Sequence, residues 1–411
     1  MKRECAMVIA GAGEAGTAAA VALRNGGWGG RIILIGNEAS LPYERPPLSK
    51  ALLTEEDDPT PKFLISPERL AELAIDYRQD QIVEAIDRAS RTVILSRCER
   101  LSYERLLLAT GARPRLLNIP IADGCQLATL RTYADAMKIR NAIKPGTKIV
   151  VIGGGFIGLE IAAGAVSKNA SVTVLEAGPR LLMRAVPPGI AQRIQAKHEK
   201  AGVRIELNSA VAGIELVGDQ SSVVLANNRR HAGDLVIVGV GALPNVELAR
   251  AAGLAVDNGI AADDILATSD PNIFAAGDCC SFVHRLFDRR IRLEVWRNAW
   301  QQGAAAAANM LGANASYQNV PWFWSDQYDQ TLQIAGIYDE TSTPICRNLG
   351  AKGHITFFMG DNGRMVAACG FGDLPAISKD IRIAESMIGK RLAPNVAALA
   401  DPTIAIKSLA A

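Results

Sequence analysis

The chain lacks the cysteine and histidine patterns that build disulfide frameworks and zinc sites. Its seven cysteines are an odd number, are scattered along the chain and include no C-x-x-C motif. Its four histidines lie far apart in the sequence. We therefore expect neither a disulfide framework nor a metal site. Scattered cysteines fit a reducing compartment, so a cytoplasmic location is expected.

The chain also lacks an excess of charge of either sign. It has 44 basic and 42 acidic residues and a formal net charge of +2. A general nucleic-acid binder would carry a clear basic excess, so nucleic acid is not expected as a partner. The length of 411 residues suggests two or three domains, enough chain to bury a large core without cross-links.

Long uninterrupted hydrophobic runs are absent as well. The most apolar stretch, residues 149–166, contains glycines and Glu160 in its middle, which argues against a membrane span. The N-terminus begins Met1-Lys2-Arg3 like a secretory signal, but Glu4 and Glu14 interrupt the apolar part that follows. We expect neither a signal peptide nor a membrane partner.

The sequence does contain an internal repeat of one structural unit. In each copy a buried strand, a glycine turn, a helix and a second strand follow one another. They span 7–10, 11–16, 17–23 and 31–35 in the first copy, and 149–152, 153–158, 159–166 and 171–175 in the second. Both turns read Gly-x-Gly-x-x-Gly, and the flanking strand and helix make this short motif specific.

Each turn is suited to hold a dinucleotide. The first glycine allows the tight turn, the second lets a pyrophosphate approach the backbone, and the third lets helix and strand pack closely. An acidic residue about 20 positions further on should bind the ribose. Glu176 fits this role in the second unit, whereas Asn37 and Glu38 are both candidates in the first.

Two dinucleotide sites in one chain require two dinucleotides, and FAD with a nicotinamide is the natural pair. Glu176 would repel a 2′-phosphate, which favours NADH over NADPH. Arg180 nearby is a feature that could accommodate such a phosphate.

Later segments extend this plan. Residues 269–278 indicate a strand that ends in Gly277-Asp278, and a carboxylate there can accept from ribityl hydroxyls. A helix is predicted over 298–311, with its N-terminal dipole directed at the flavin. The first domain is therefore discontinuous. Further on, the pattern predicts antiparallel strands and a helix, at 332–337, 353–359, 365–372 and 377–388.

Several longer motifs carry a family resemblance. They are PYERPPLSK at 42–50, ATGARP at 109–114, LRT at 130–132, GGGFIGLE at 153–160, AGDC at 276–279 and PWFWSDQ at 321–327. With them the chain resembles, nearly end to end, the ferredoxin reductases of glutathione-reductase fold, a group that includes putidaredoxin, rubredoxin and Rieske-dioxygenase reductases.

The resemblance implies an α/β fold with two Rossmann-like dinucleotide-binding domains and a small α+β C-terminal domain. An FAD domain is expected at 1–113 and 245–319, an NADH domain at 114–244 and an interface domain at 320–411. The oligomeric state is left open between a monomer and a homodimer.

The resemblance also implies which residues hold the cofactors. For FAD they are Gly11, Gly13, Ala15, Gly16, Asn37, Glu38, Arg45, Lys50, Val83, Thr110, Gly111, Arg131, Gly277, Asp278, Trp296 and Trp324, with Val83 acting through its backbone. For NADH they are Gly153, Gly155, Ile157, Gly158 and Glu176. The family often has an acid in place of Asn37, so whether Asn37 or Glu38 binds the ribose stays open.

The implied reaction is hydride transfer from NADH to flavin N5, followed by single-electron transfer to a 2Fe-2S ferredoxin that serves an oxygenase. We expect Lys50 and Glu160 to pair beside N5, with Glu160 at the opening of its helix. Trp324 is expected near the flavin, on the electron exit path or as a wall beside the nicotinamide. The simpler interpretations are that Lys50 is a solvated loop lysine, that Glu160 is an ordinary acid in the first turn of its helix, and that Trp324 is a packing residue between domains.

Residues 39–60 contain no cysteine, unlike the disulfide reductases of this fold, so no sulfur relay is expected there. Rubredoxin reductase, or a redox sensor with a long-lived NADH complex, remains as the alternative function.

A basic stretch from His284 to Arg297 is a candidate docking surface for an acidic ferredoxin. Arg289, Arg290 and Arg297 lie in it, and Lys407 could join the same surface. The alternative is an ordinary solvated loop.

Overall fold

The computed structural model describes residues 6–55, 59–183 and 185–410, so Met1-Lys2-Arg3 and Cys5 lie outside the described residues. The chain forms two compact units. Unit 1 consists of residues up to Glu44, Pro61–Arg113 and Leu243–Pro321; unit 2 consists of Arg45–Thr60, Pro114–Ala242 and the residues from Trp322 onward. Residues 45–60, assigned from sequence to the first domain, thus belong to unit 2, together with the expected NADH and C-terminal domains.

Unit 1 is built on a parallel sheet. Its strand order is β19-β7-β1-β2-β3, with β19 at Ile273–Ala275, β7 at Arg105–Leu108, β1 at Ala6–Ala10, β2 at Arg31–Ile35 and β3 at Ile75–Arg78. Every residue of β1 is buried, which explains its uninterrupted apolar sequence. The predicted strand–turn–helix–strand unit is therefore present.

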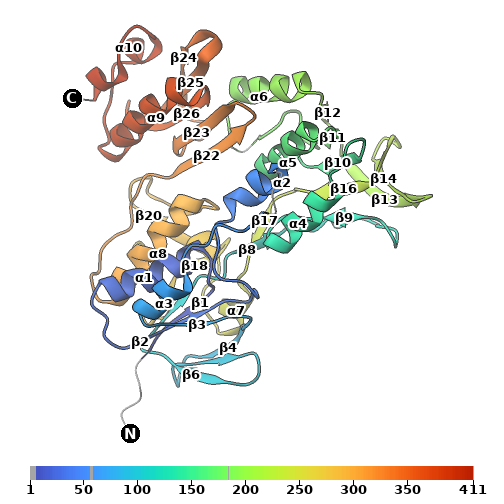
Figure 1. Ribbon diagram of the computed structural model, residues 1–411. Helices are drawn as coiled ribbons and strands as arrows, with labels where there is room; N and C mark the ends of the chain where they lie inside the picture. Colours follow the sequence, from blue (N-terminus) through green and yellow to red (C-terminus); the bar gives the residue numbers. More distant parts are fainter. Residues whose placement is uncertain (1–5, 56–58, 184, 411) are drawn as a thin grey trace. The chain divides into compact units, whose positions relative to one another are not determined.

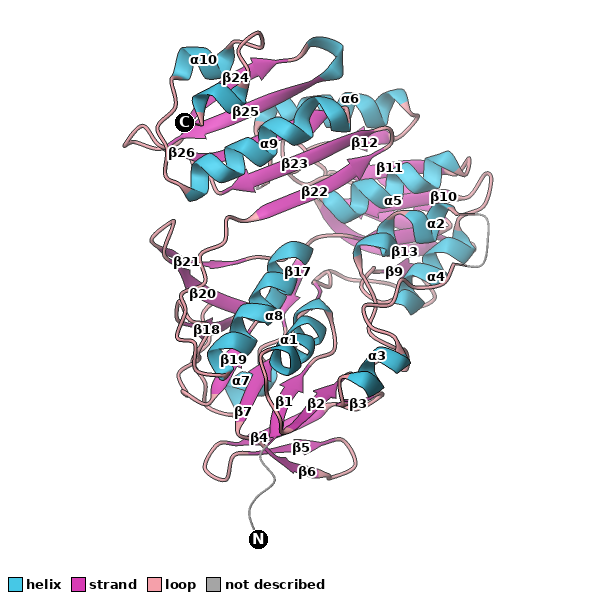
Figure 2. Ribbon diagram, turned by 60° about the vertical axis from the view of Figure 1, so that its left-hand side comes forward, coloured by secondary structure: helices cyan, strands magenta, loops and turns pink. Residues whose placement is uncertain are grey.

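Two helices, α1 (Glu14–Asn25) and α8 (Trp296–Met310), lie side by side in unit 1 (Figures 1 and 2). They come this close because Gly303 has no side chain: a Cβ there would lie 2.1 Å from the carbonyl oxygen of Ala15. The other elements of unit 1 are α3 (Pro67–Glu72), β4 (Val83–Asp87), β5 (Thr92–Leu95), β6 (Arg100–Ser102), α7 (Glu247–Ala251), β18 (Ile260–Ala262), η2 (Gly277–Cys279), β20 (Cys280–His284) and β21 (Arg289–Arg292).

Unit 2 repeats the parallel sheet. Its order is β12-β11-β10-β16-β9, with β12 at Arg204–Glu206, β11 at Ser171–Leu175, β10 at Lys148–Ile152, β16 at Leu235–Val238 and β9 at Leu127–Ala128. Around it are η1 (Pro46–Ser49), α2 (Ala51–Thr54), α4 (Tyr133–Ala142), α5 (Phe156–Ser167), α6 (Pro188–Lys200), β13 (Val211–Val217), β14 (Gln220–Leu225) and β15 (Arg230–Gly233). The chain passes between the units at β8 (Ala112–Pro114) and β17 (Ala242–Pro244).

The C-terminal part of unit 2 is an antiparallel sheet of order β22-β23-β26-β25-β24 with α9 (Leu374–Gly389) packed on it (Figure 2). The strands are β22 (Trp322–Gln327), β23 (Gln330–Gly336), β24 (Thr343–Asn348), β25 (Gly353–Met359) and β26 (Met365–Gly372); η3 (Gly350–Lys352), α10 (Val396–Ala400) and η4 (Ile406–Leu409) complete it. The three predicted strands and the helix are confirmed; β22 and β24 were not predicted.

One hydrophobic cluster joins the two parts of unit 2. It combines Leu159 of α5, the loop after β11 and α6 with Leu332 and Phe371 of the antiparallel sheet. This shared core fixes the antiparallel sheet against α5 and α6. In the described residues, no helix has the length and apolar character that crossing a bilayer demands.

Candidate functional site

The first glycine turn joins β1 to α1 in a conformation that only glycines allow. Gly11 has a φ of +117°, and a Cβ there would lie 2.1 Å from the carbonyl oxygen of Ala109. A Cβ on Gly16 would lie 1.8 Å from the carbonyl oxygen of Gly11. Gly13 differs, because its Cβ would meet no atom within 4 Å. The space beside Gly13 is thus open for a ligand.

The second turn, between β10 and α5, repeats this geometry. Gly153 has a φ of +106°, and a Cβ on Gly158 would lie 2.6 Å from the carbonyl oxygen of Gly153. Beside Gly155 the nearest atom to a Cβ would be 3.8 Å away. Gly13 and Gly155 are the N-caps of α1 and α5, and neither helix has a side-chain cap. Both N-termini can therefore present backbone N–H groups to phosphates.

The two units differ where their second strand ends. In unit 2 the carboxylate of Glu176 directly follows β11 and accepts hydrogen bonds from the N–H groups of Gly154 and Gly178, each at 2.7 Å. In unit 1 the residue after β2 is Gly36, and a Cβ there would lie 2.8 Å from Cβ of Ala12. No carboxylate can occupy that position, so an acceptor for the ribose must come one or two residues later.

Asn37 is exposed, and Glu38 is half-buried and accepts a hydrogen bond from the buried Tyr43 hydroxyl. Both remain candidates. Arg180, the residue that could have received a 2′-phosphate, donates to the carbonyl oxygens of Met183 and Val186 at 2.7 and 2.9 Å. Its guanidinium is therefore already hydrogen-bonded to the backbone of the loop that follows it.

The Gly277-Asp278 turn lies at the start of α1. A Cβ on Gly277 would lie 3.1 Å from Cβ of Ala15, and its N–H donates to the fully buried Gln302 at 2.9 Å. Asp278 is half-buried, and its backbone carbonyl accepts from Arg292 at 3.1 Å. Trp296 is the first residue of α8 and hydrogen-bonds Glu14 of α1. Burial raises the pKa of Glu14 to about 7, and that hydrogen bond offsets only part of the rise.

Other predicted FAD contacts divide between the units. In unit 1, Thr110 exchanges hydrogen bonds with Asn245 at 2.7 and 2.8 Å, Gly111 has a φ of +67°, and Val83 lies at a bulge of β4. In unit 2, the guanidinium of Arg45 donates to the carbonyl oxygen of Arg131 at 2.5 Å. Lys50 and Trp324 also lie in unit 2.

Glu160 is the centre of a charged cluster inside unit 2. It is the fifth residue of α5 and not its opening residue, as expected from sequence, and it is 8% exposed. Ser49 donates to its Oε2 and Ser325 to its Oε1. The Nζ of Lys50 lies 3.7 Å from Oε1 of Glu160 and 2.9 Å from Oδ2 of Asp326. Burial raises the pKa of Glu160, while Lys50 and the two serines oppose the rise.

Local packing brings these groups together. Gly164 of α5 lets α2 approach, since a Cβ there would lie 3.3 Å from Cγ2 of Thr54. Because Ser49 and Lys50 directly precede α2, this contact places them beside α5. In addition, Phe323 of β22 packs on Phe156 of α5, with ring centroids 4.5 Å apart. The Nζ of Lys50 also lies 5.1 Å from the ring centroid of Trp324, which stacks on Trp322.

Residues 6–303 match the pattern of the pyridine nucleotide-disulphide oxidoreductases, and residues 322–410 match the reductase C-terminal domain. The chain belongs to the pyridine nucleotide-disulphide oxidoreductase family. The predicted fold of two Rossmann-like domains with a C-terminal reductase domain is confirmed.

Relatives of this oxidoreductase span nearly its whole length. The ferredoxin–NAD(+) reductase component of the anthranilate 1,2-dioxygenase system of Burkholderia cepacia is 39% identical over 402 residues, 98% of each chain. The rubredoxin–NAD(+) reductase of Pseudomonas putida is 38% identical over 332 residues, 80% of this chain and 86% of that one. The solved covalent complex of putidaredoxin reductase with putidaredoxin gives a TM-score of 0.93 at 36% identity, covering 99% and 98% of the two chains.

FAD and NADH are the two cofactors of such an oxidoreductase, and its residues fit them. Each glycine turn leaves open space at its middle glycine beside an uncapped helix N-terminus. Ile157, in the first turn of α5, is 49% exposed, unusual for an isoleucine beside a helix N-terminus and consistent with a ligand contact.

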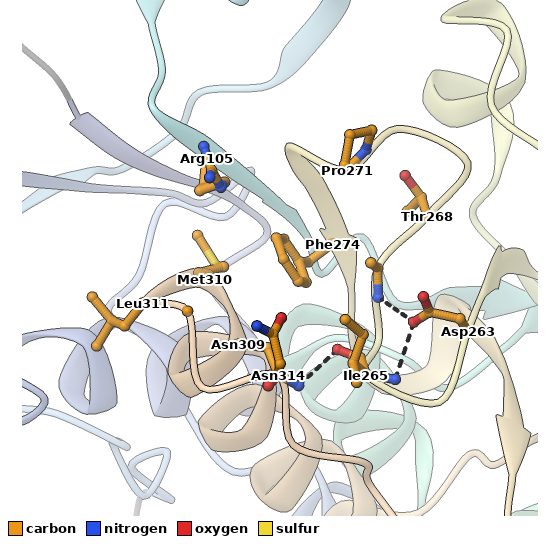
Figure 3. A pocket seen from close by; sticks show the side chains of 12 residues that line it. Arg105, Asp263, Ile265, Thr268, Pro271, Phe274, Asn309, Met310, Leu311 and Asn314 are labelled. Atoms are coloured by element: carbon orange, nitrogen blue, oxygen red, sulfur yellow. Dashed lines mark hydrogen bonds between the residues drawn. The ribbon is translucent and has the colours of Figure 1, made fainter.

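The oxidoreductase has another hollow, of about 480 Å³, in unit 1 (Figure 3). It lies beside Phe274, Met310 and Asp263 and includes none of the predicted site residues. Asp263 accepts hydrogen bonds from the N–H groups of Ile265 and Ala267, at 3.0 and 2.9 Å, so this carboxylate at the wall of the hollow already has partners within the protein. Among the described residues, no cluster of three or more side chains could hold a metal ion.

Sequence analysis overlooked Ser49, Ser325 and Asp326 as site residues. All three lie inside the quoted motifs: Ser49 is next to Lys50, Ser325 is next to Trp324, and Asp326 is two residues from Trp324. The period-2 alternation of 322–327 is the signal that could have found Ser325, because it puts Ser325 and Gln327 on the buried face of β22.

Proposed function

We propose that this chain is an FAD-containing, NADH-dependent reductase that delivers electrons one at a time to a ferredoxin of an oxygenase system. The charged cluster around Glu160 is the observation that carries the proposal. Lys50 and Ser49 occupy the segment where disulfide reductases of this fold carry a redox cysteine, and residues 39–60 contain none. Without a sulfur relay, electrons must pass to an external acceptor.

Bound FAD and NADH would supply the hydride chemistry, which no side chain can provide. The chain's own residues bind, orient and set the local charge. We assign to Glu160 the stabilisation of positive charge on the nicotinamide side, since a fixed carboxylate favours such charge as it develops. Lys50 balances Glu160 and Asp326. Trp324, in contact with Lys50, is assigned to the electron exit path.

We assign the cofactor contacts as the motifs predict, with FAD in unit 1 at the Gly11 turn and NADH in unit 2 at the Gly153 turn. The open spaces at Gly13 and Gly155 support this assignment. The division into FAD, NADH and interface domains is part of the same proposal.

The partner surface is proposed at Arg289, Arg290 and Arg297 of unit 1; Lys407, which the sequence analysis added to it, belongs to unit 2. Arg289, Arg290 and Lys407 are exposed, whereas Arg297 is half-buried. Arg290 also donates to the carbonyl oxygen of Ala262 at 2.9 Å, so its head is anchored to unit 1. An anchored guanidinium is a defined partner for an acidic protein.

An anaerobic titration tests the function. NADH should bleach the flavin band of the holoprotein, and a 2Fe-2S ferredoxin added afterwards should become reduced as the flavin reoxidises. Lys50→Met should slow the bleaching at least tenfold, whereas Lys138→Met, at a lysine of α4 that donates to the carbonyl oxygen of Leu127, should not. Coupling to ferredoxin should weaken with rising salt, because surface attraction is screened.

Rubredoxin is the second candidate acceptor, because a rubredoxin reductase is 38% identical to this chain. Fast reduction of rubredoxin with slow reduction of ferredoxin would overturn the ferredoxin assignment. Arg289→Gln should lower ferredoxin coupling, while Arg69→Gln, whose arginine lies outside the basic stretch and pairs with Glu72 at 2.6 Å, is the matched control.

A further inference from the structure

A path of buried polar side chains leads from Glu160 toward the surface of unit 2. Ser325 donates to Glu160, and Nε2 of Gln327 donates to Oγ of Ser325 at 2.9 Å. Oε1 of Gln327 lies 2.8 Å from Nε2 of His198, and the hydroxyl of Tyr328 lies 3.1 Å from Nδ1 of His198. Ser325, Gln327 and His198 are fully buried, and Tyr328 is 37% exposed. The reaction assigned above uses none of the last three.

The donors of this path all point toward Glu160. Because Gln327 uses its amide N–H on Ser325, its carbonyl oxygen faces His198, and Nε2 of His198 must carry the hydrogen. The other ring nitrogen is then the acceptor for the Tyr328 hydroxyl. Burial lowers the pKa of His198, the hydrogen bond with Gln327 opposes this and neighbouring Lys197 adds to it; the lowered pKa favours the neutral ring that this order requires. Aligned hydrogen bonds of this kind strengthen one another.

Two elements are shaped to build the path. The alternation of β22 buries Ser325 and Gln327 and leaves Asp326 outside, beside Lys50. Tyr328 follows in the tight turn to β23 with a φ of +61°, a conformation unfavourable for a bulky residue. That conformation sets the Tyr328 ring edge-on against His198, with centroids 5.0 Å apart.

We propose that His198 is a positioning residue for hydride transfer: through Gln327 and Ser325 it keeps hydrogen-bond donors directed at Glu160, and so keeps this buried carboxylate ionised and oriented opposite Lys50. The proposal rests on the proposed function, because it gives Glu160 its role in the reaction with NADH. The charged groups that face Glu160 are Lys50 and Asp326, and those near His198 are Lys197 and the Tyr328 phenol.

Loss of the His198 donor has a specific consequence. The Gln327 amide is then free to turn its carbonyl toward Ser325, and the Ser325 hydroxyl would donate to it instead of to Glu160. Glu160 would keep only Ser49 and Lys50 against the cost of burial, so it would take up a proton at a higher pH.

The test measures the rate constant of flavin reduction at saturating NADH as a function of pH, in the holoenzyme. Wild type should lose rate on the acid side as Glu160 is protonated, and Glu160→Gln should abolish that acid limb. His198→Leu should move its midpoint up by about one pH unit or more. His198→Gln, which can keep an N–H near the position of Nε2, should restore the wild-type midpoint. Tyr328→Phe is the matched control and should leave the midpoint unchanged, because this variant removes a donor only on the outer side of His198.

Gln327→Met removes the same donor within the strand and should reproduce the shift if His198→Leu fails to bind flavin. In a Ser325→Ala background, His198→Leu should add nothing, since the path is already cut. An equal shift in both backgrounds, or no shift in either His198→Leu or Gln327→Met, would overturn the proposal. An acid limb that survives Glu160→Gln would instead overturn the assignment of Glu160, and with it this inference. Absence of flavin reduction by NADH in wild type would overturn the proposed function itself.

Discussion

Both units place a glutamate on the helix that follows the glycine turn, half-buried Glu14 in unit 1 and buried Glu160 in unit 2, but they surround the two carboxyl groups differently. Glu14 of α1 has one oxygen that is buried with no partner among the described residues, and its pKa is raised to about 7. Glu160 of α5 accepts a hydrogen bond on each oxygen and has Lys50 at 3.7 Å. Burial raises the pKa of both carboxyl groups, but the scaffold supplies a hydrogen-bond donor to each oxygen of Glu160 and leaves one oxygen of Glu14 without one among the described residues.

The glycines teach a related lesson. In each turn the third glycine is required by the protein itself, because a Cβ on Gly16 or Gly158 would overlap backbone. The middle glycine is required only by a ligand, because the space beside Gly13 or Gly155 is open. Folding and binding are therefore assigned to different positions of one short motif.

The largest expected effect separates these two requirements in unit 2. Gly158→Ala should lower the free energy of unfolding by about 3 kcal/mol, because the clash with Gly153 is with backbone. Gly155→Ala should leave stability within about 0.5 kcal/mol and weaken NADH binding at least tenfold. Denaturant unfolding and NADH titration measure both quantities. A Gly158→Ala protein as stable as Gly155→Ala would contradict the division.

A smaller effect is expected at the strand ends, where Glu176 has no counterpart directly after β2. Glu176→Ala should weaken NADH binding about tenfold, equivalent to about 1.4 kcal/mol, and narrow the preference over NADPH. The measurement is kcat/KM for both cofactors. Arg180 should not help NADPH, since it is bound to loop carbonyls. Glu38→Ala, the matched change in unit 1, should leave the NADH parameters unchanged; an equal loss there would contradict the contrast between the two strand ends.

Much of this architecture could be predicted because it follows from local pattern. The strands at 7–10 and 149–152 are apolar throughout, and their glycine turns can adopt few conformations. The helix starts were wrong by three residues for the same reason in both units. Gly16 and Gly158 lie inside α1 and α5, which begin directly after Gly13 and Gly155. For this reason Glu160 lies in the second turn, where the antiparallel sheet can cover it.

The partners of Glu160 could not be predicted from local pattern. Ser49 lies 111 positions away and Ser325 lies 165, and they meet because η1 and β22 both pack on α5. His198 gave no signal either, because a histidine in the last turn of an amphipathic helix normally interacts with the helix dipole. The proposed role of His198 follows only from the folded structure, in which Gln327 of β22 lies within hydrogen-bond distance of its ring.

The smallest expected effect concerns Glu14, and it sharpens the contrast with Glu160. Because the folded protein holds this proton up to a pH of about 7, while the unfolded chain releases it near 4.5, the stability of the fold should fall as pH rises through that interval. Glu44 nearby adds to the effect and Lys62 opposes it. Glu14→Gln should remove this dependence, and the melting temperature of the holoprotein should then decline less between pH 5 and 8, by about 2–4 °C. Glu68→Gln, the same change on the surface of α3, should keep the wild-type slope. Identical slopes for all three proteins would mean that Glu14 is ionised after all, and that an uncapped helix N-terminus alone suffices to hold a buried carboxylate charged.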